Sequence, residues 1–290
     1  MNKNNIFISV SGGETSWYMA HLIKSKYPDK NLLFGFANTG KERIETLDFN
    51  QKCSEYFGIN LIWVEAIVHP SRKGCTHKIV DYSTADKKGD TFENVIAKYG
   101  IPNVSFPHCT RELKANPLKS LADEYFGKNN YHKAIGIRVD EIDRVSPLKD
   151  KLKLIYPLVS PYSTDKPTIN AFWNTMPFRL KLKSYEGNCD YCFKKSDRKL
   201  CTIRSSEDGK LFQWWHEMEH LYEYFKASRN TSKYPPPYRF FRKNKTCNDI
   251  DILSKSKFIK SLDEKYIVNL NFNDEFDISG GCEESCEPLF

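Results

Sequence analysis

The stretch from Ile6 to Ser16 reads IFISVSGGETS, and it decides the fold. Its first five residues are rich in β-branched and aromatic types, which predicts a strand buried on both faces of a sheet. The next three, Ser-Gly-Gly, predict a sharp turn. Beyond the turn, apolar residues recur with helical spacing at Met19, Ala20, Ile23 and Tyr27. The unit is therefore a strand, a glycine turn and a helix that we expect to begin near Thr15.

A glycine turn in front of a helix is typical of an anion site. Backbone N–H groups at Gly12 and Gly13 can point at a ligand, and the helix end adds partial positive charge. A Walker loop needs Gly-Lys-Ser/Thr after a four-residue gap, and a dinucleotide fingerprint needs a third glycine. Neither is present. Taken alone, the two glycines are equally well explained by a tight turn without a ligand.

The composition is that of a globular protein with a real core. The chain has 290 residues, of which 40% are hydrophobic. No apolar run approaches the roughly 20 residues that span a bilayer, so we expect a cytoplasmic protein with no membrane partner. Nine cysteines favour reduced thiols or metal ligands over a disulfide framework. A net charge of +7 fits a phosphorylated ligand or nucleic acid and is diagnostic of neither.

Predicted strands and helices alternate over the first part of the chain. Further strands are predicted over residues 32–37, 59–68, 131–139 and 153–159. Helices are predicted from Glu42, over residues 91–99, and after Asn116, where Asn-Pro is typical of an N-cap and first turn. This α/β pattern favours a doubly wound parallel sheet. Residues 69–90 interrupt it, and their length predicts a flap or a disordered insertion.

Ligands of such sheets bind beyond the carboxyl ends of the strands. Asn38, Thr39 and Gly40 follow the second strand, so their loop should face the glycine turn. Arg138 follows the fourth strand and can fork two hydrogen bonds onto a phosphate. Glu141 could fix that fork or bind a hydroxyl.

A second basic pair precedes the helix predicted at Asn116. Arg111 and Lys114 would lie where a helix start holds an anion. The alternative for this pair is a solvated basic turn.

Four segments in this order resemble the phosphoadenosine phosphosulfate (PAPS) reductase family, particularly its compact phage-type members. They read SGGETS, ANTGKERIETLDF, CTRELK and GIRVDEIDR. The same resemblance extends to the adenine nucleotide α-hydrolase superfamily, which includes the ATP pyrophosphatases. It implies that ATP or PAPS binds with Mg²⁺. The pyrophosphate or phosphosulfate would lie on Ser11, Gly12, Gly13, Thr15 and Ser16, the adenosine near Asn38 to Gly40, and the other anionic groups on Arg111, Lys114 and Arg138.

The function that this resemblance implies first is an ATP pyrophosphatase that adenylates an acceptor, such as a nucleotide or nucleic acid, for attack by a sulfur donor. A thiol-dependent PAPS or APS reductase is the alternative, and a non-catalytic nucleotide- or nucleic-acid-binding module is a third. Two departures stand out. ATP pyrophosphatases carry an acidic residue where Thr15 stands, and the reductases' Glu-Cys-Gly-x-His motif is absent. The setting would be the host cytoplasm if a phage encodes the chain.

We expect two units, a nucleotide-binding domain over residues 1–160 and a helical, cysteine-containing appendage over residues 161–290. Cys189 and Cys192 form a Cys-x-x-Cys turn, which is half a metal site. Cys282 and Cys286 could supply the other half. Zinc and a 4Fe–4S cluster both accept four thiolates, and the resemblance favours the cluster. Four free or redox-paired thiols are the alternative, and Cys201 is a spare candidate ligand.

Two aromatic segments of the appendage have competing interpretations. A stripe over residues 211–225 is typical of a helix packed on a core rather than of a stacking platform for bases. Residues 234–245 alternate aromatic rings with cations, which would suit single-stranded nucleic acid. A solvated basic strap is the commoner interpretation of that second segment.

Overall fold

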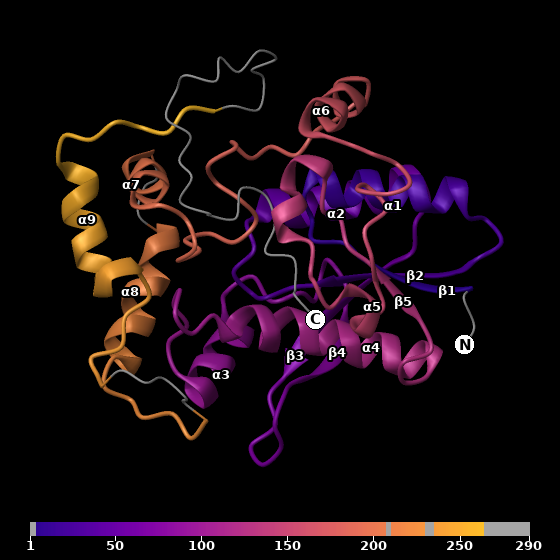
Figure 1. Cartoon of the computed structure of the whole chain (residues 1–290). Coiled ribbons are helices and arrows are strands. Elements are labelled where there is room, and N and C mark those ends of the chain that lie inside the picture. The colour runs from indigo at the N-terminus through magenta and orange to yellow at the C-terminus, as the bar shows by residue number, and fades with distance from the viewer. Residues whose placement is uncertain (1–3, 207–209, 230–234, 264–290) are drawn as a thin grey trace.

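A six-stranded sheet with helices on both faces forms the centre of the protein (Figure 1). The computed structural model describes residues 4–206, 210–229 and 235–263. The strand order is β4-β3-β2-β1-β5-β6, and every neighbouring pair is parallel except β3 and β4. The strands are β1 (Asn5–Ser9), β2 (Asn31–Ala37), β3 (Leu61–Ile67), β4 (Thr76–Val80), β5 (His132–Ala134) and β6 (Leu154–Ile155). The predicted α/β class with a mostly parallel sheet is confirmed.

The helices connect and cover these strands. They are α1 (Glu14–Lys26), α2 (Ile44–Phe57), α3 (Asp90–Tyr99), α4 (Asn116–Phe126), α5 (Lys149–Leu152), α6 (Lys166–Asn174), α7 (Asp197–Ser206), α8 (Lys210–Tyr222) and α9 (Cys247–Lys255). A π-helical turn, η1 (Thr110–Ala115), runs directly into α4, and two 3₁₀ turns are η2 (Val139–Arg144) and η3 (Arg242–Asn244). No helix among these is long and apolar enough to cross a bilayer, within the part of the chain that the structure describes.

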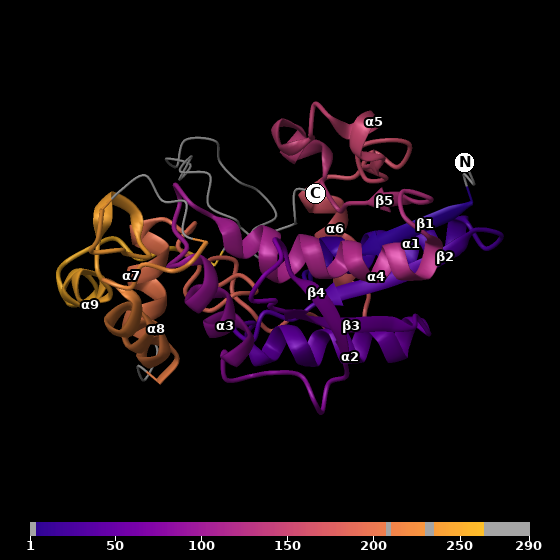
Figure 2. The ribbon, with the colours of Figure 1, turned by 90° about the horizontal axis from the view of Figure 1, so that it is seen from below.

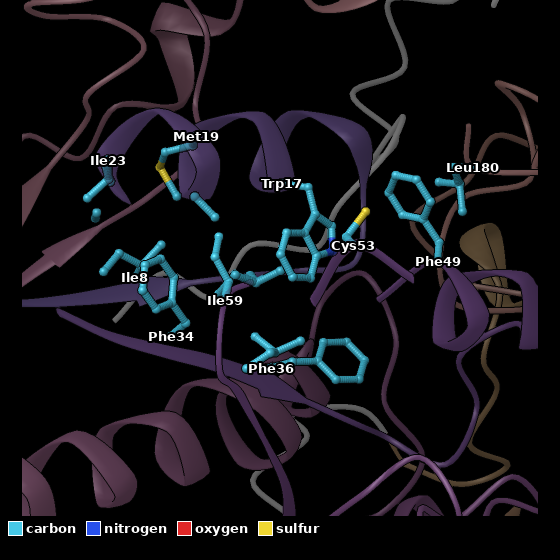
Figure 3. Close-up of a cluster of buried hydrophobic side chains, with 14 of the residues drawn as sticks. Ile8, Trp17, Met19, Ile23, Phe34, Phe36, Phe49, Cys53, Ile59 and Leu180 are labelled. Carbon is cyan, nitrogen blue, oxygen red and sulfur yellow. The ribbon is translucent and has the colours of Figure 1, made fainter. Parts of the chain in front are cut away.

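Both faces of β1 are buried, as its unbroken apolar run predicts. Ile8 packs under α1 and α2, where Figure 3 shows it in one cluster with Trp17, Met19 and Phe34. Its neighbour Phe7 points to the other face and packs with α4. Burying one such side chain contributes about 1.5 to 3 kcal/mol. The two faces of β1 therefore fix the first helix on one side of the sheet and α4 on the other.

The prediction of a flap or insertion over residues 69–90 is wrong. The segment contains β4, which pairs antiparallel with β3 at the edge of the sheet. It also carries Asp86, whose carboxylate accepts bonds from the amides of Lys88, Gly89 and Thr91. The edge strand is short and its side chains are half-buried or exposed, so it lacks the apolar pattern of its neighbours. The two later strands are also shorter than predicted, because the chain after each turns into loops.

The predicted helix does begin at Asn116, with Pro117 in its first turn, but the N-cap role predicted for Asn116 is wrong. Asn116 has helical dihedral angles, and its backbone N–H donates to the carbonyl of Arg111 within η1. Its side chain donates to Glu112 instead of capping a helix. The first turn of α4 therefore follows η1 without a break. The anion site expected in front of it is not formed, because a continuous helix has no free N–H groups at that point.

Residues after 160 contribute to two hydrophobic cores. The first core lies beneath α1 and α2, and the second joins α3 to α7, α8 and α9. Trp173 of α6 is fully buried in the cluster beneath α1, and its indole N–H donates to the Glu14 carbonyl at 3.0 Å. Helices α7, α8 and α9 lie together on the side of the sheet where the parallel strands end (Figures 1 and 2). Their second core joins Trp215 and Phe212 to Phe92 of α3. The expected boundary at residue 160 stays a prediction, although residues 161–182 pack on the first core.

The burial of the aromatic side chains decides between the interpretations of the two aromatic segments. Trp215 and Met218 of α8 are buried, which confirms the core interpretation of that stripe for these residues. Phe240 and Phe241 are also buried, at 0% and 3% exposure. Because these two rings fill the second core, they do not form a stacking platform for bases.

Candidate functional site

The glycine loop, residues 11–16, joins β1 to α1. Gly12 has a φ of +89°, a backbone conformation that residues with side chains rarely adopt. A Cβ atom there would lie 2.5 Å from Cγ2 of Thr46. Gly13 has a φ of −92° and precedes the helix in ordinary extended conformation. Of the two glycines, Gly12 is therefore the one that the turn requires.

Two serines hold the glycine loop together. The Ser16 hydroxyl donates to the Gly13 carbonyl at 2.9 Å and accepts from the Ser11 amide at 3.1 Å. The Ser11 hydroxyl also donates to Ser16, at 3.1 Å. The structure thus brings the predicted loop residues together through bonds that span five residues or fewer.

Arg138 reaches the glycine loop from the far side of β1. Its Nη1 donates to the Thr15 hydroxyl at 3.2 Å, and the side chain is 7% exposed. Asp140 accepts from the other side of the guanidinium at 3.0 Å, and Glu141 lies 3.4 Å from Nη1. Glu141 therefore fixes the arginine, which is one of its two predicted roles. The loops after β1 and β5 meet where the chain switches direction in the sheet, which is the ligand position of doubly wound folds.

The loop after β2 is braced from inside. The Asn38 side-chain amide donates to Glu65 and to the Asp86 carbonyl, both at 2.7 Å, and its oxygen accepts from the Gly40 amide. Gly40 has a φ of +80°, and a Cβ atom there would lie 2.3 Å from Asp86. Because the Asn38 side chain is used within the protein, a ligand at this loop would meet backbone groups and the neighbouring side chains.

The basic pair predicted at residues 111 and 114 is split. Lys114 is 11% exposed and pairs with the buried Glu42 at 3.0 Å, close to the Thr39 hydroxyl, which also donates to Glu42. The Arg111 side chain is 57% exposed and pairs with Glu112. A π-helical turn places neighbouring side chains on a different spacing from an α-helix. Lys114 joins the site, whereas the expectation that Arg111 lies beside it at a helix start is wrong.

The cysteine loop, residues 187–195, lies directly against the glycine loop. The Asn188 side chain donates to the Ser11 carbonyl at 2.9 Å across 177 residues of sequence. The Asn188 carbonyl accepts from the Arg43 amide at 2.7 Å. Next to it, Asp190 forms a buried ion pair with Lys41 at 3.0 Å. Sequence reasoning missed these contacts, because it placed the cysteine loop in a separate appendage.

Cys189 lies beside Glu42, to which it is joined by a single antiparallel backbone bridge. Burial raises the pKa of the Cys189 thiol well above its ordinary value, and the Glu42 carboxylate adds to this. Cys192 is buried nearby in the chain, and Cys201 is buried on α7. Among residues 4–206, 210–229 and 235–263, no three His, Cys, Asp or Glu side chains form a metal-binding group.

The predicted ligands Cys282 and Cys286 lie outside the described residues. The donor set that the described residues offer is therefore two thiolates of the four that zinc or a 4Fe–4S cluster takes. This half set does not by itself fit either group.

Three buried polar atoms, in β1, the loop after β2 and α2, have no hydrogen-bond partner among the described residues. They are Oγ of Ser9, Oε2 of Glu42 and Nδ2 of Asn50. Nδ2 of Asn50 lies 3.0 Å from where a Cβ atom of Gly12 would be. Buried polar groups in proteins are nearly always hydrogen-bonded, so the unpartnered Nδ2 of Asn50 beside Gly12 indicates a place for a polar ligand or water.

A cavity of about 440 Å³ lies next to the β2 loop rather than on the glycine loop. Glu65 and Asp86, which brace Asn38 from inside, form part of its wall. Lys78, Lys88 and Asn94 line it as well. This cavity therefore lies beside the β2 loop, toward the edge of the sheet that β4 forms.

Comparisons with known proteins find a relative of this chain but do not indicate an activity for it. No family model matches the chain. It is 28% identical over 287 residues to the "Uncharacterized nin region protein ORF290" of Escherichia phage lambda, which covers 97% of this chain and 93% of the relative. The similarity spans both the sheet and the C-terminal helices, and it suggests a phage origin for the chain.

Proposed function

We propose that the chain is an enzyme that binds an adenine nucleotide across the crevice between β1 and β5 and acts on it as an ATP pyrophosphatase. One observation carries this proposal: Arg138, from the loop after β5, contacts Thr15 of the glycine loop after β1 at the switch point of the sheet. The unpartnered Nδ2 of Asn50 beside that turn supports a polar ligand there. The resemblance of the four sequence segments to the PAPS reductase family suggests which ligand.

The phosphates would lie on the glycine loop. Backbone N–H groups at the start of α1 face an anion with the favourable end of the helix dipole. Arg138 is already aimed at this loop, and its charge-assisted bonds to Asp140 are of the kind that a phosphate oxygen can replace. Lys114, held by Glu42, supplies a second cation. Mg²⁺ would neutralise the phosphate chain when bound, largely through the phosphates themselves.

The chemistry is transfer of the adenylyl group. An acceptor oxygen attacks the α-phosphorus of ATP, the bond to the bridging oxygen breaks, and pyrophosphate leaves. The protein supplies position and positive charge rather than a nucleophile. The adenylated acceptor then loses AMP to a sulfur or nitrogen nucleophile. A nucleotide or nucleic acid in the host cytoplasm fits as acceptor, with a sulfur compound as donor.

A reductase is the second candidate, and the position of Cys189 is the observation that favours it. Cys189 is next to Glu42 and Lys114, at the same site as the glycine loop. In that reaction Cys189 first loses its proton, which its raised pKa makes costly. Its thiolate then attacks the sulfate sulfur of PAPS, and the sulfur–oxygen bond to the phosphate breaks. An added thiol then reduces the S-sulfocysteine, which releases sulfite and leaves a disulfide.

Product analysis separates these candidates. The chain is incubated with Mg²⁺-ATP and with nucleotide or nucleic-acid acceptors, and pyrophosphate release is measured. Arg138→Lys keeps the charge but loses the fork, so kcat/KM should fall at least about tenfold. Arg229→Lys is the control, because Arg229 bonds to the Ser71 carbonyl at the surface. Sulfite from PAPS without pyrophosphate from ATP would favour the reductase, and neither product would leave the binding module.

A further inference from the structure

Glu42 has a buried carboxylate with one oxygen in use and one without a partner. Oε1 lies 3.0 Å from Nζ of Lys114 and accepts from the Thr39 hydroxyl at 3.1 Å. Oε2 has no hydrogen-bond partner among the residues that the structure describes, although the side chain is 0% exposed. A charged acceptor that is buried without a donor is strongly unfavourable, unless a ligand or water supplies the missing bond.

The position of Glu42 connects it to the proposed phosphate site. It lies in the loop beyond the carboxyl end of β2, and β2 is the neighbour of β1 in the sheet. The next residue, Arg43, donates its amide to Asn188, whose side chain bonds to the Ser11 carbonyl. Further along, Thr46 packs against Gly12. Glu42 is thus connected to the glycine loop by two short series of contacts, one through Arg43 and Asn188 and the other through Thr46.

We infer that Oε2 of Glu42 accepts a hydrogen bond from a ribose hydroxyl of the bound nucleotide. This inference rests on the proposed function, which puts the phosphates on the glycine loop. In doubly wound nucleotide-binding sheets, an acidic residue beyond the second strand takes the ribose hydroxyls of a nucleotide whose phosphates lie after the first. A hydroxyl is the donor that a carboxylate oxygen in this position lacks.

The consequence is selection among adenine nucleotides. A phosphate on the 3′-oxygen would remove the donor and bring negative charge against the Glu42 carboxylate, and like charges in a buried site repel strongly. Lys114 contacts the other carboxylate oxygen, Oε1, so the nucleotide would meet the unpartnered oxygen Oε2. The site therefore accepts a free ribose, as in ATP or adenosine 5′-phosphosulfate, and rejects the 3′-phosphorylated ribose of PAPS.

Matched ligand pairs test this on the unaltered protein. Titration calorimetry with Mg²⁺ compares ATP with 2′-deoxy-ATP and 3′-deoxy-ATP, and AMP with 3′-phosphoadenosine 5′-phosphate. Loss of the contacted hydroxyl should weaken binding at least about tenfold, as expected for a hydrogen bond to a charged group. The added 3′-phosphate should weaken binding by at least as much.

A variant of Glu42 distinguishes direct contact with the nucleotide from a purely structural role of this residue. Glu42→Gln removes the charge and keeps the shape, so discrimination against the 3′-phosphate should fall at least about tenfold. Glu55→Gln, at an exposed position of α2, is the control and should change nothing. Equal binding of ATP and both deoxy analogues, or equal weakening of every ligand by Glu42→Gln, would overturn the inference and leave the proposed function standing. Binding of no nucleotide at all would remove the proposed function itself.

Discussion

The glycine loop and the cysteine loop lie side by side but are held in different ways. Ser16 holds the glycine loop through bonds to Ser11 and Gly13, its own near neighbours. The cysteine loop depends on partners from the start of the chain, since Asn188 bonds to Ser11 and Asp190 pairs with Lys41. The internal bonds of the first loop therefore join residues close in sequence, whereas those of the second join residues far apart in the chain.

The largest expected effect comes from the ion pair that anchors the cysteine loop. Lys41→Met leaves the buried Asp190 without its cation, which should cost about 3 to 5 kcal/mol of unfolding free energy in urea titrations. Adding Asp190→Leu should recover most of that loss, because an apolar pair replaces the ionic one. A double variant as unstable as Lys41→Met alone would show that the pair is not the anchor.

Substitutions at the two glycines of the glycine loop should lower the free energy of unfolding by different amounts. Gly12→Ala combines a left-handed backbone with a collision against Thr46, and should cost about 2 to 5 kcal/mol in the same titration. Gly13 has an ordinary extended backbone, so Gly13→Ala should cost less than about 1 kcal/mol. Equal losses at the two positions would contradict the turn geometry described for Gly12.

The segment that presents Lys114 should be sensitive to acid. Burial lowers the pKa of His108, which precedes η1, from 6.5 to about 4. The folded state then binds the proton more weakly than the unfolded state, so His108 contributes stability above about pH 6.5 that is lost as the pH falls to about 4. The loss should reach about 3 kcal/mol. His108→Phe should flatten this part of the pH profile of urea unfolding, and parallel profiles would refute the assignment.

The smallest effect on folding should come from the contact between the two loops. Asn188→Ala leaves the Ser11 carbonyl without its donor, which should cost about 1 to 3 kcal/mol. The same change should weaken ATP binding about tenfold, since it loosens the turn that carries the phosphates. Asn60→Ala, at an exposed position, is the control for stability. Unchanged ATP affinity in Asn188→Ala would show that the cysteine loop does not support the nucleotide site.

The same contrast explains what the sequence could predict. The unit of β1, the glycine loop and α1 follows from residues within one turn or strand of each other, so local patterns predict it. The contact of Asn188 with Ser11 spans 177 residues and leaves no periodic signal. Asn116 shows the opposite failure: α4 does begin there, but the N-cap that its local Asn-Pro pattern predicts is overridden by η1 and Glu112.

The burial of the second core was also hidden from local patterns. Phe240 and Phe241 occur among cations and prolines, which is typical of an exposed strap. They are buried because α3 and α8 together form an apolar surface, which the sequence of either segment alone does not predict. Glu42 was missed for a related reason: its buried position depends on Lys114 and the cysteine loop, which reach it from other parts of the chain.

Titration calorimetry of the intact chain with Mg²⁺-ATP tests the central claim most directly, because the claim is that the glycine loop and Arg138 form one phosphate site. The account predicts one ATP per chain, with affinity at least about tenfold weaker in Arg138→Lys and unchanged in Arg229→Lys. No heat of binding with either ATP or PAPS, from protein that unfolds cooperatively in urea, would contradict it.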